Sequence, residues 1–348
     1  MSSPQISVVI PVYNGEEYLS HTLDSLLQQS FSNFEVLLID DCSTDESNSI
    51  LQLYMLQDSR VHVIKTDSNQ GIVPKVINRF AIPRLRGQYY VYASQDDIFS
   101  QDWLERMFAR ASETEADAVL PDLIFYYERE PGRNHALVGV NGDRDIVLSN
   151  REAVILSLDW QIPGNALWRT QLIQKIRYAD FGMHADDYSA RVFFFHCNKV
   201  VFSGGTFFYR QDNPEAISKK LSWKAFDLPY MHYMLYEFLL TNEFPDKICT
   251  GELAKAVDHL FSNKQMLLDK RSQMSPDAVK KAEKELERAY YSLRRNRSAL
   301  RFLRTRKGVK NILKMAAVLS SYSGFGLACK FMYNVRKARR AASILGPT

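Results

Sequence analysis

The chain contains 348 residues, of which 46% are apolar and 24% charged, and its formal net charge is +4 at pH 7. This length exceeds one compact core and predicts about two domains, or one domain with a long appendage, while the apolar content is ordinary for a soluble protein. The four cysteines lie far apart, which excludes a CxxC pair or a cysteine-based metal spacing and indicates reduced thiols in a cytosolic setting.

The charge is distributed unevenly along the chain. Residues 288–348, here called the basic tail, contain fifteen lysines and arginines and no acidic residue, which leaves 29 basic and 40 acidic residues in 1–287. A segment of this kind is expected to bind an anionic surface. That surface is membrane lipid, nucleic acid or the acidic body of the protein itself.

Apolar strands alternate with helices in the first part of the chain. The predicted strands occupy residues 6–10, 34–39, 61–64 and 89–93. The predicted helices occupy residues 16–29 and 73–81, with another helix capped by Ser43 or Thr44. This alternation predicts an α/β fold with a doubly wound, mostly parallel sheet and helices on both faces.

The pattern becomes less regular after the fourth strand and then entirely helical. Further strands are predicted at 118–120, 123–127, 199–202 and 206–209, and helices at 103–110, 151–158 and 188–197. From residue 222 onward the sequence is helical, with one helix predicted from Ser275 to Arg306 and Pro276 in its first turn. We therefore predict two domains, 1–220 and 221–348.

A polar loop follows each of the first four strands. These loops carry Asn14, Asp41, Asn69 and the pair Asp96-Asp97. Turn chemistry alone explains any one of them, because Asn and Asp are common in turns. Their recurrence at every strand end instead predicts one crevice at the carboxyl edge of the sheet, where ligands bind. Successive side chains alternate in direction, so one acid of the pair faces a ligand and the other braces the loop.

The loop after the first strand restricts the kind of nucleotide site. It begins at Pro11 and contains neither a G-x-G-x-x-G dinucleotide motif nor a P-loop. Without a glycine-rich cradle, a metal has to neutralise a bound diphosphate, and Asp96 suits a hard cation such as Mg²⁺ or Mn²⁺. Tyr13 offers a flat face for a base, and Asp41 offers an acceptor for a base N–H.

Several segments resemble glycosyltransferase family 2, of GT-A fold, in their order and spacing. They are residues 6–14, 39–45, 69–71 with Asn78, and 94–98 with Trp103-Leu104. The resemblance covers roughly residues 1–210. It implies an inverting glycosyltransferase that moves a sugar from a nucleoside diphosphate sugar to a hydroxyl of a saccharide or lipid-linked saccharide, in surface polysaccharide synthesis. UDP- or dTDP-sugars are favoured, because an acceptor at Asp41 suits the N3–H of a pyrimidine.

The same resemblance implies a set of donor contacts. Pro11, Tyr13 and Asp41 would hold the nucleobase, and Asp96 corresponds to the metal-binding acid of the family's D-x-D motif. The motif here reads Ser94-Gln95-Asp96, so a serine replaces the leading aspartate. The remaining expected donor contacts are Asn14, Asn69, Lys75, Ser94, Gln95 and Arg210.

A second acidic pair, Asp186-Asp187, precedes the helix predicted at 188–197. Helix capping explains such a pair equally well. The resemblance to the family's Glu-Asp motif implies that Asp187 is the general base and that Asp186 replaces the glutamate. His184 is a rival base. Together with Asp186 and His184, Trp160 is expected to bind the acceptor, although a core aromatic is as consistent with the sequence.

The basic tail includes an uncharged stretch, residues 315–329, that is shorter than the ~20 residues of a membrane span. We predict a membrane-surface segment with basic residues at the lipid headgroups. A helical cap on the body, or an oligomer interface, is the alternative. The residues expected to enter the lipid are Phe325, Leu327, Phe331 and Met332.

Two other classes of function remain open at this stage. A sugar-nucleotide nucleotidyltransferase requires a glycine-rich loop after the first strand, and a non-catalytic membrane or nucleic-acid adaptor leaves the strand-end loops unexplained. No basic and apolar leader precedes the first strand, so a signal peptide is not expected. We expect a cytoplasmic protein, peripheral on the inner face of the cell membrane, without a nucleic-acid partner and able to form a homo-oligomer.

Overall fold

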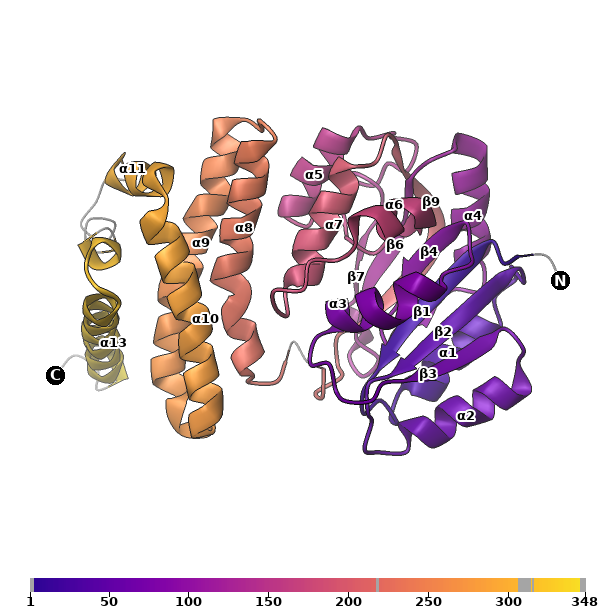
Figure 1. Cartoon of the computed structure of the whole chain (residues 1–348), viewed down its shortest axis with the longest axis horizontal. Coiled ribbons are helices and arrows are strands. Elements are labelled where there is room, and N and C mark those ends of the chain that lie inside the picture. The colour runs from indigo at the N-terminus through magenta and orange to yellow at the C-terminus, as the bar shows by residue number, and fades with distance from the viewer. Residues whose placement is uncertain (1–2, 217–218, 306–313, 315, 345–348) are drawn as a thin grey trace. The chain divides into compact units, whose positions relative to one another are not determined.

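The computed structural model describes residues 3–216, 219–305, 314 and 316–344 (Figure 1). The chain divides into two compact units. The first unit spans Met1–Phe181 and Ala185–Pro214, and the second spans Gly182–His184 and Glu215–Thr348.

The first unit is built on a mixed sheet. In chain order its strands are β1 (Ile6–Val12), β2 (Phe34–Asp40), β3 (Val61–Lys65), β4 (Tyr89–Tyr92), β5 (Ile98–Phe99), β6 (Ala118–Tyr126), β7 (His135–Leu137), β8 (Leu167–Arg169) and β9 (Val200–Arg210). Their spatial order is β3-β2-β1-β4-β8-β6-β9-β5, and β7 pairs with β6. Strands β3, β2, β1 and β4 are parallel, whereas β8 runs antiparallel to both β4 and β6. The expected α/β fold is confirmed, with an antiparallel strand inserted at β8.

Helices cover the sheet of the first unit. They are α1 (Leu19–Leu27), α2 (Ser47–Gln57), α3 (Val73–Val76), α4 (Trp103–Thr114), α5 (Asn150–Leu158), α6 (Thr170–Ile176) and α7 (Ala185–Phe195). On one face, Val8 and Ile10 of β1 cluster with Leu23 of α1. Val9 points the opposite way and is also fully buried, where the π-helical turn Ile77–Ala81 packs on β1 and β2. Burial on both faces explains why these strands are almost continuously apolar.

Strands β6 and β9 are longer than the sequence predicted. Each is continuous, although two short strands were expected in each place. In β6 the prediction failed at Pro121, which lies where the register with β9 shifts between Leu120 and Asp122. Proline has no N–H to donate, and a bulge is a position in a strand where none is required. In β9 the prediction of two strands failed at Gly204 and Gly205, which lie inside the continuous strand. Gly205 allows α4 to pack closely there, because a Cβ at this position would approach the backbone of α4 to within 2.7 Å.

The second unit is helical. It contains a short 3₁₀ helix (Trp223–Asp227), α8 (Leu228–Thr241), α9 (Asp246–Lys270), α10 (Pro276–Arg295), α11 (Arg297–Thr305) and α13 (Tyr322–Ile344). The helix predicted over 275–306 ends at Arg295, because the Asn296 side chain accepts a hydrogen bond from the N–H of Ala299 and caps α11. Within the described part of the chain, the helices are too short or too polar to cross a membrane.

Candidate active site

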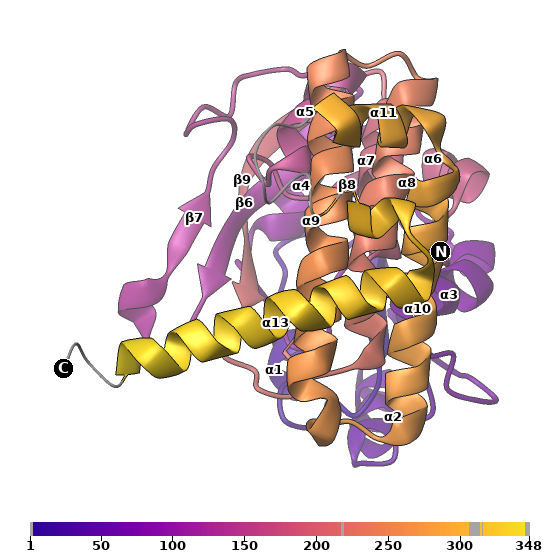
Figure 2. The same ribbon diagram turned by 90° about the vertical axis from the view of Figure 1, so that its left-hand side faces the viewer.

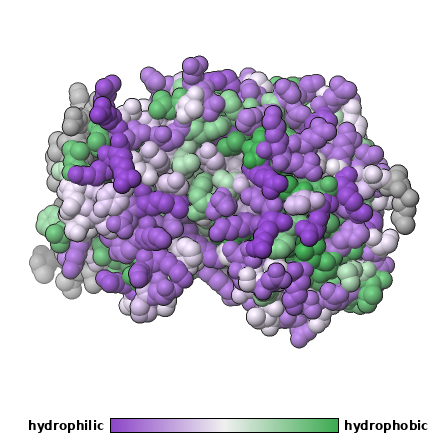
Figure 3. Space-filling model, in the orientation of Figure 1, coloured by the Kyte–Doolittle hydropathy of each residue, from purple (hydrophilic) through white to green (hydrophobic). Residues whose placement is uncertain are grey.

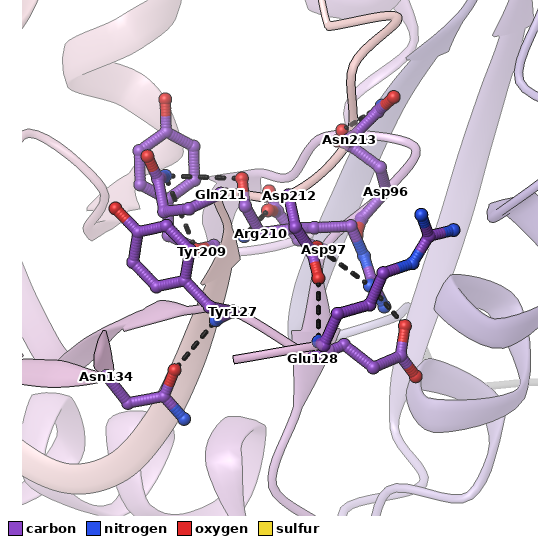
Figure 4. Close-up of polar contacts among 11 residues, drawn as sticks. Asp96, Asp97, Tyr127, Glu128, Asn134, Tyr209, Arg210, Gln211, Asp212 and Asn213 are labelled. Atoms are coloured by element: carbon purple, nitrogen blue, oxygen red, sulfur yellow. Dashed lines mark hydrogen bonds and ion pairs between the residues drawn. The ribbon is translucent and has the colours of Figure 1, made fainter. Parts of the chain in front are cut away.

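The loop between β4 and β5 carries the acid pair that the sequence analysis singled out (Figure 4). Asp97 is buried, with 1% of its surface exposed. Its Oδ1 accepts a hydrogen bond from the N–H of Arg210 at 3.1 Å, and its Oδ2 accepts one from the N–H of Ser94 at 3.2 Å. Burial, and then the charge of Asp96, raises the pKa of Asp97 above its ordinary value. Asp97 therefore braces the loop from within.

Asp96 is only half-buried, and its Oδ2 accepts a hydrogen bond from Nδ2 of Asn213 at 2.7 Å. Among the residues that the structure describes, no group of three or more His, Cys, Asp or Glu side chains could enclose a metal. One carboxylate nevertheless fits a hard cation that keeps waters and takes further ligands from substrate phosphates. Asp96 thus suits a cation bound together with a diphosphate. Asn213 orients it, and no motif in the sequence marked this residue.

Arg210, expected to contact the donor phosphates, has 1% of its side chain exposed. Its Nη1 pairs with Glu128 at 2.6 Å and with Asp212 at 3.4 Å, and its Nε donates to the backbone oxygen of Asp96 at 2.8 Å (Figure 4). The guanidinium also lies over the ring of Tyr18, at 4.5 Å from its centroid. Its Nη2 is a buried donor without a hydrogen-bond partner among the described residues. Arg210 therefore holds the acid loop on the end of β9.

The loop after β1 is tied to the loops after β2 and β4. The side-chain amide of Gln95 forms two hydrogen bonds with the backbone of Tyr13, one accepted from its N–H at 2.8 Å and one donated to its carbonyl at 3.1 Å. The side-chain oxygen of Asn14 accepts from the N–H of Thr44 at 2.8 Å, and the N–H of Asn14 donates to Oγ of Ser43. The ring of Tyr13 stays exposed, with 44% of the residue accessible.

Asp41 joins the loops after β2 and β3. Its two carboxylate oxygens accept hydrogen bonds from the N–H of Gln70 at 2.9 and 3.0 Å, and Oδ1 also accepts from Oγ1 of Thr66. The side chain of Asn69 donates to the backbone oxygen of Asp41 at 3.1 Å. Asp41 and Asn69, both expected to contact the donor, thus shape the loops that meet at the carboxyl edge of the sheet.

Three other residues predicted to bind the donor lie on nearby elements. Pro11 is in β1, paired in register with Ile39 of β2. Ser94 is the second residue after β4, and its side-chain oxygen lies 3.4 Å from the hydroxyl oxygen of Tyr92. Lys75 is exposed on α3.

The second acid pair lies inside a helix. Helix α7 begins at Ala185, three residues earlier than predicted, so Asp186 and Asp187 occupy its first turn. Nη1 of Arg191 donates to Oδ1 of Asp187 at 2.6 Å and to its backbone oxygen at 2.7 Å, and Nη2 donates to the backbone oxygen of Ser157 at 2.6 Å. A buried arginine therefore fixes the carboxylate of Asp187.

The charges of both acid pairs act on Tyr209 in β9. Burial raises the pKa of Tyr209 to about 12, and four carboxylates add to this effect: those of Asp97, Asp186, Asp96 and Asp187. Burial and then the charge of Asp186 also raise the pKa of Tyr92, at the end of β4. Carboxylates that are about 90 residues apart in the chain therefore act on the same side chains.

The other residues expected to bind the acceptor lie in different surroundings. Trp160 has 39% of its surface exposed, and its ring lies 6.5 Å from that of Phe125 and 6.0 Å from the guanidinium carbon of Arg191. His184 belongs to the second unit, where its N–H and its Nδ1 both bond to the buried carboxylate of Asp227. Asp227 was not predicted, because it lies 43 residues further along the chain.

A cavity of about 670 Å³ lies at the opposite, amino-terminal end of β4, β6 and β9. Three of its charged side chains already have protein partners. Arg169 pairs with Asp117 at 2.9 Å, Asp117 also accepts from the N–H of Asn198, and Lys199 donates to the backbone oxygen of Thr114. The carboxyl edge, with its exposed Tyr13 and half-buried Asp96, is therefore the stronger candidate for a ligand site.

Comparisons with known proteins concern the family and the fold. A model of the family described as "Glycosyl transferase family 2" matches residues 7–212. The chain is 26% identical over 238 residues to "Glycosyltransferase GlyG" of Streptococcus pneumoniae, covering 64% of this chain and 76% of that protein. It is 36% identical over 121 residues to "Poly(ribitol-phosphate) beta-glucosyltransferase" of Bacillus spizizenii, covering 34% of this chain and 19% of that protein.

A solved structure, S. aureus TarS 1–349 in complex with UDP-GlcNAc, is similar across both units. The TM-score is 0.65 at 17% sequence identity, with 97% of this chain and 92% of that chain covered. This likeness confirms the expected GT-A-like α/β fold with a helical C-terminal region.

Proposed function

Because the chain belongs to glycosyl transferase family 2, we propose that it transfers a sugar from a UDP- or dTDP-sugar to a hydroxyl group with inversion at the anomeric carbon. The membership confirms the expected family and the expected class of enzyme, a glycosyltransferase. The observation that carries the proposal is that the charges of both acid pairs act on one side chain, Tyr209. A donor activated at one pair and an acceptor deprotonated at the other have to share one site. The UDP-GlcNAc held by the similar TarS structure supports the choice of donor.

Asp187 acts as the general base in this proposal. Its carboxylate takes the proton of the acceptor hydroxyl while that oxygen forms a bond to the anomeric carbon. The bond from this carbon to the donor diphosphate breaks at the same time, and the diphosphate leaves with the electron pair. General base catalysis of this kind contributes about 10²–10⁴-fold in rate. The bonds from Arg191 to the carboxylate and to the backbone carbonyl of Asp187 hold this residue in one orientation for the step.

Asp96 holds the divalent cation, Mn²⁺ or Mg²⁺, that the family resemblance implies. A cation at this position would offset the negative charge of the departing diphosphate. The chain's own contribution is to orient the Asp96 carboxylate through Asn213 and to hold its loop through Arg210. Nη2 of Arg210 is the further donor that we assign to a phosphate oxygen, because it has no hydrogen-bond partner among the described residues; since it is buried, this contact requires a local movement when the donor binds.

The acceptor is a saccharide or lipid-linked saccharide of a surface polymer. The name of the Bacillus spizizenii relative, a poly(ribitol-phosphate) glucosyltransferase, supports a polymer with free hydroxyl groups as the acceptor, although that polymer is a polyol phosphate and not a saccharide. Trp160, with its exposed ring above Arg191, is the surface on which an acceptor sugar would stack. Residues 1–220 carry the transfer chemistry in this proposal, and residues 221–348 form the accessory helical domain.

Two substitutions separate the proposed base from the proposed metal ligand. We expect Asp187→Asn to lower the rate of sugar transfer by about 10²-fold or more while Mn²⁺-dependent donor binding persists. Asp96→Ala should instead remove the gain in donor affinity that Mn²⁺ provides, measured by calorimetry with and without the ion. Asp180→Asn is the control, since Asp180 is an exposed acid of the same region.

Either half of this assignment can fail separately. Parental transfer rates in Asp187→Asn would exclude Asp187 as the base. A Mn²⁺ effect of unchanged size in Asp96→Ala would remove Asp96 from the metal site.

A further inference from the structure

Helix α13 presents two different faces. Its inner face belongs to the core of the second unit: Phe325 is fully buried, and its ring lies 5.1 Å from that of Phe261 in α9 and 5.3 Å from that of Tyr290 in α10. Figure 2 shows α13 crossing these two helices. The prediction that Phe325 enters a lipid layer is therefore wrong, because its side chain is already buried among other side chains of the second unit.

The outer face carries large apolar side chains that the protein leaves exposed. Leu327 is 70% exposed and Phe331 is 68% exposed. The two lie four residues apart, so they are neighbours on one side of the helix. Lys330, beside Phe331, is also exposed, and Met332 is half-buried. In the view of Figure 3 the surface is mainly hydrophilic, with several groups of hydrophobic residues among the hydrophilic ones.

The charge of the surrounding sequence indicates what covers this face. The basic tail contains fifteen lysines and arginines and no acidic residue. Four of them, Arg336, Lys337, Arg339 and Arg340, follow within α13 itself. An apolar pair flanked by basic residues on one helix matches an anionic lipid surface, which offers acyl chains below phosphate headgroups.

We propose that α13 lies on an anionic membrane surface, with Leu327 and Phe331 entering the acyl boundary and the basic residues at the headgroups. Lipid fits these observations better than nucleic acid does, because a nucleic-acid contact uses the charge and leaves the exposed leucine and phenylalanine without a role. The proposal concerns attachment alone and does not depend on which residue performs sugar transfer.

The test compares two pairs of exposed apolar residues in the full-length protein. The tail variant is Leu327→Ser/Phe331→Ser. The matched control is Leu53→Ser/Leu56→Ser on α2 of the first unit, where the two leucines are 52% and 82% exposed. Binding is measured by flotation with vesicles of phosphatidylcholine, with and without phosphatidylglycerol, at low and high salt. Circular dichroism and thermal unfolding verify that each variant is folded.

We expect the parent protein to float only with vesicles that contain phosphatidylglycerol. The tail variant should lose roughly tenfold or more of this binding, since two large apolar groups no longer enter the lipid, and the control should keep it. Binding of the parent to neutral vesicles alone, or equal losses in both variants, would overturn the proposal.

Two other partners of α13 give distinct results. Duplex DNA that binds the parent and the tail variant equally, with no vesicle binding, would assign the charge to nucleic acid. A change of oligomeric state in the tail variant without any vesicle binding would assign the outer face to a second copy of the chain. Both outcomes contradict the membrane assignment.

Discussion

Arg191 bonds to two groups of Asp187 and to one group of Ser157. Its side chain is 5% exposed, and it bonds the carboxylate and the carbonyl of Asp187 and the carbonyl of Ser157. Helix α5, which contains Ser157 and precedes the loop with Trp160, is in this way connected to the proposed base. Arg191 touches no reacting atom in the proposed chemistry, so its role is to position Asp187.

Substitution of Arg191 should therefore change turnover more than donor binding. We expect Arg191→Met to lower kcat by about 10-fold or more with little change in KM for the donor. A misplaced base slows the chemical step but does not weaken donor binding. Arg191→Lys should recover part of the loss, since a lysine can reach Asp187 but cannot bond Ser157 at the same time. Steady-state kinetics decides this, with circular dichroism to verify folding. Equal losses in kcat and in donor affinity would indicate a general structural role instead.

At the scale of elements, the loops after the parallel strands form one connected edge. The bonds of Gln95 to Tyr13, of Asn14 to Thr44 and of Asp41 to Gln70 each join two loops. The sequence analysis placed these polar residues at one edge because the strand pattern was clear. Their partners were not predictable, because a hydrogen bond between loops depends on the separation of strands that are distant in the chain.

The same limit applies to the residues that the sequence analysis missed. Asn213 contacts Asp96 across 117 residues, and Asp227 contacts His184 across 43. Nothing local marks either one, since Asn213 lies in an ordinary polar segment and Asp227 ends a short 3₁₀ helix. The predicted start of α7 differs from the observed one for a local reason. The prediction puts Asp186 and Asp187 before the helix, whereas acidic residues are equally stable within a first turn.

Gly15 offers a test of the loop connection. A Cβ at this position would lie 2.7 Å from the side-chain carbonyl carbon of Gln95. Gly15→Ala should push this flexible side chain away and break its two bonds to Tyr13. We expect donor affinity to fall roughly three- to tenfold, the equivalent of about one hydrogen bond, with little loss of thermal stability. Gly132→Ala is the control, because no atom lies within 4 Å of its added Cβ. Donor affinity that is the same in both variants would contradict the proposed link.

At the scale of the whole molecule, the two units have different kinds of core. The first unit buries a sheet between helices, whereas the second packs the apolar faces of helices together and includes a few buried polar groups. Glu252 of α9 is one of these, with 3% of its side chain exposed. Its carboxylate lies 2.8 Å from Nδ1 of His232 and 2.8 Å from Nζ of Lys255. Burial acts to raise the pKa of Glu252, but the bonds and charges of His232 and Lys255 outweigh it and lower the pKa below the ordinary 4.5.

This shift makes the stability of the second unit depend on pH in a defined direction. A carboxylate with a lowered pKa in the folded state stabilises the fold above its unfolded pKa and loses that contribution as pH falls through the folded value. We expect Glu252→Gln to reduce the free energy of unfolding by about 1–3 kcal/mol at neutral pH, because His232 and Lys255 lose a charged partner. The difference from the parent should shrink as pH falls below the ordinary value of 4.5. Thermal unfolding measured across this pH range tests both statements, with Glu113→Gln, an exposed acid of α4, as the control. Because Glu252 lies outside the first unit, nucleotide-sugar binding should persist in the variant. A difference in stability that stays constant with pH would contradict this account of the second unit. A loss of donor binding would contradict it as well.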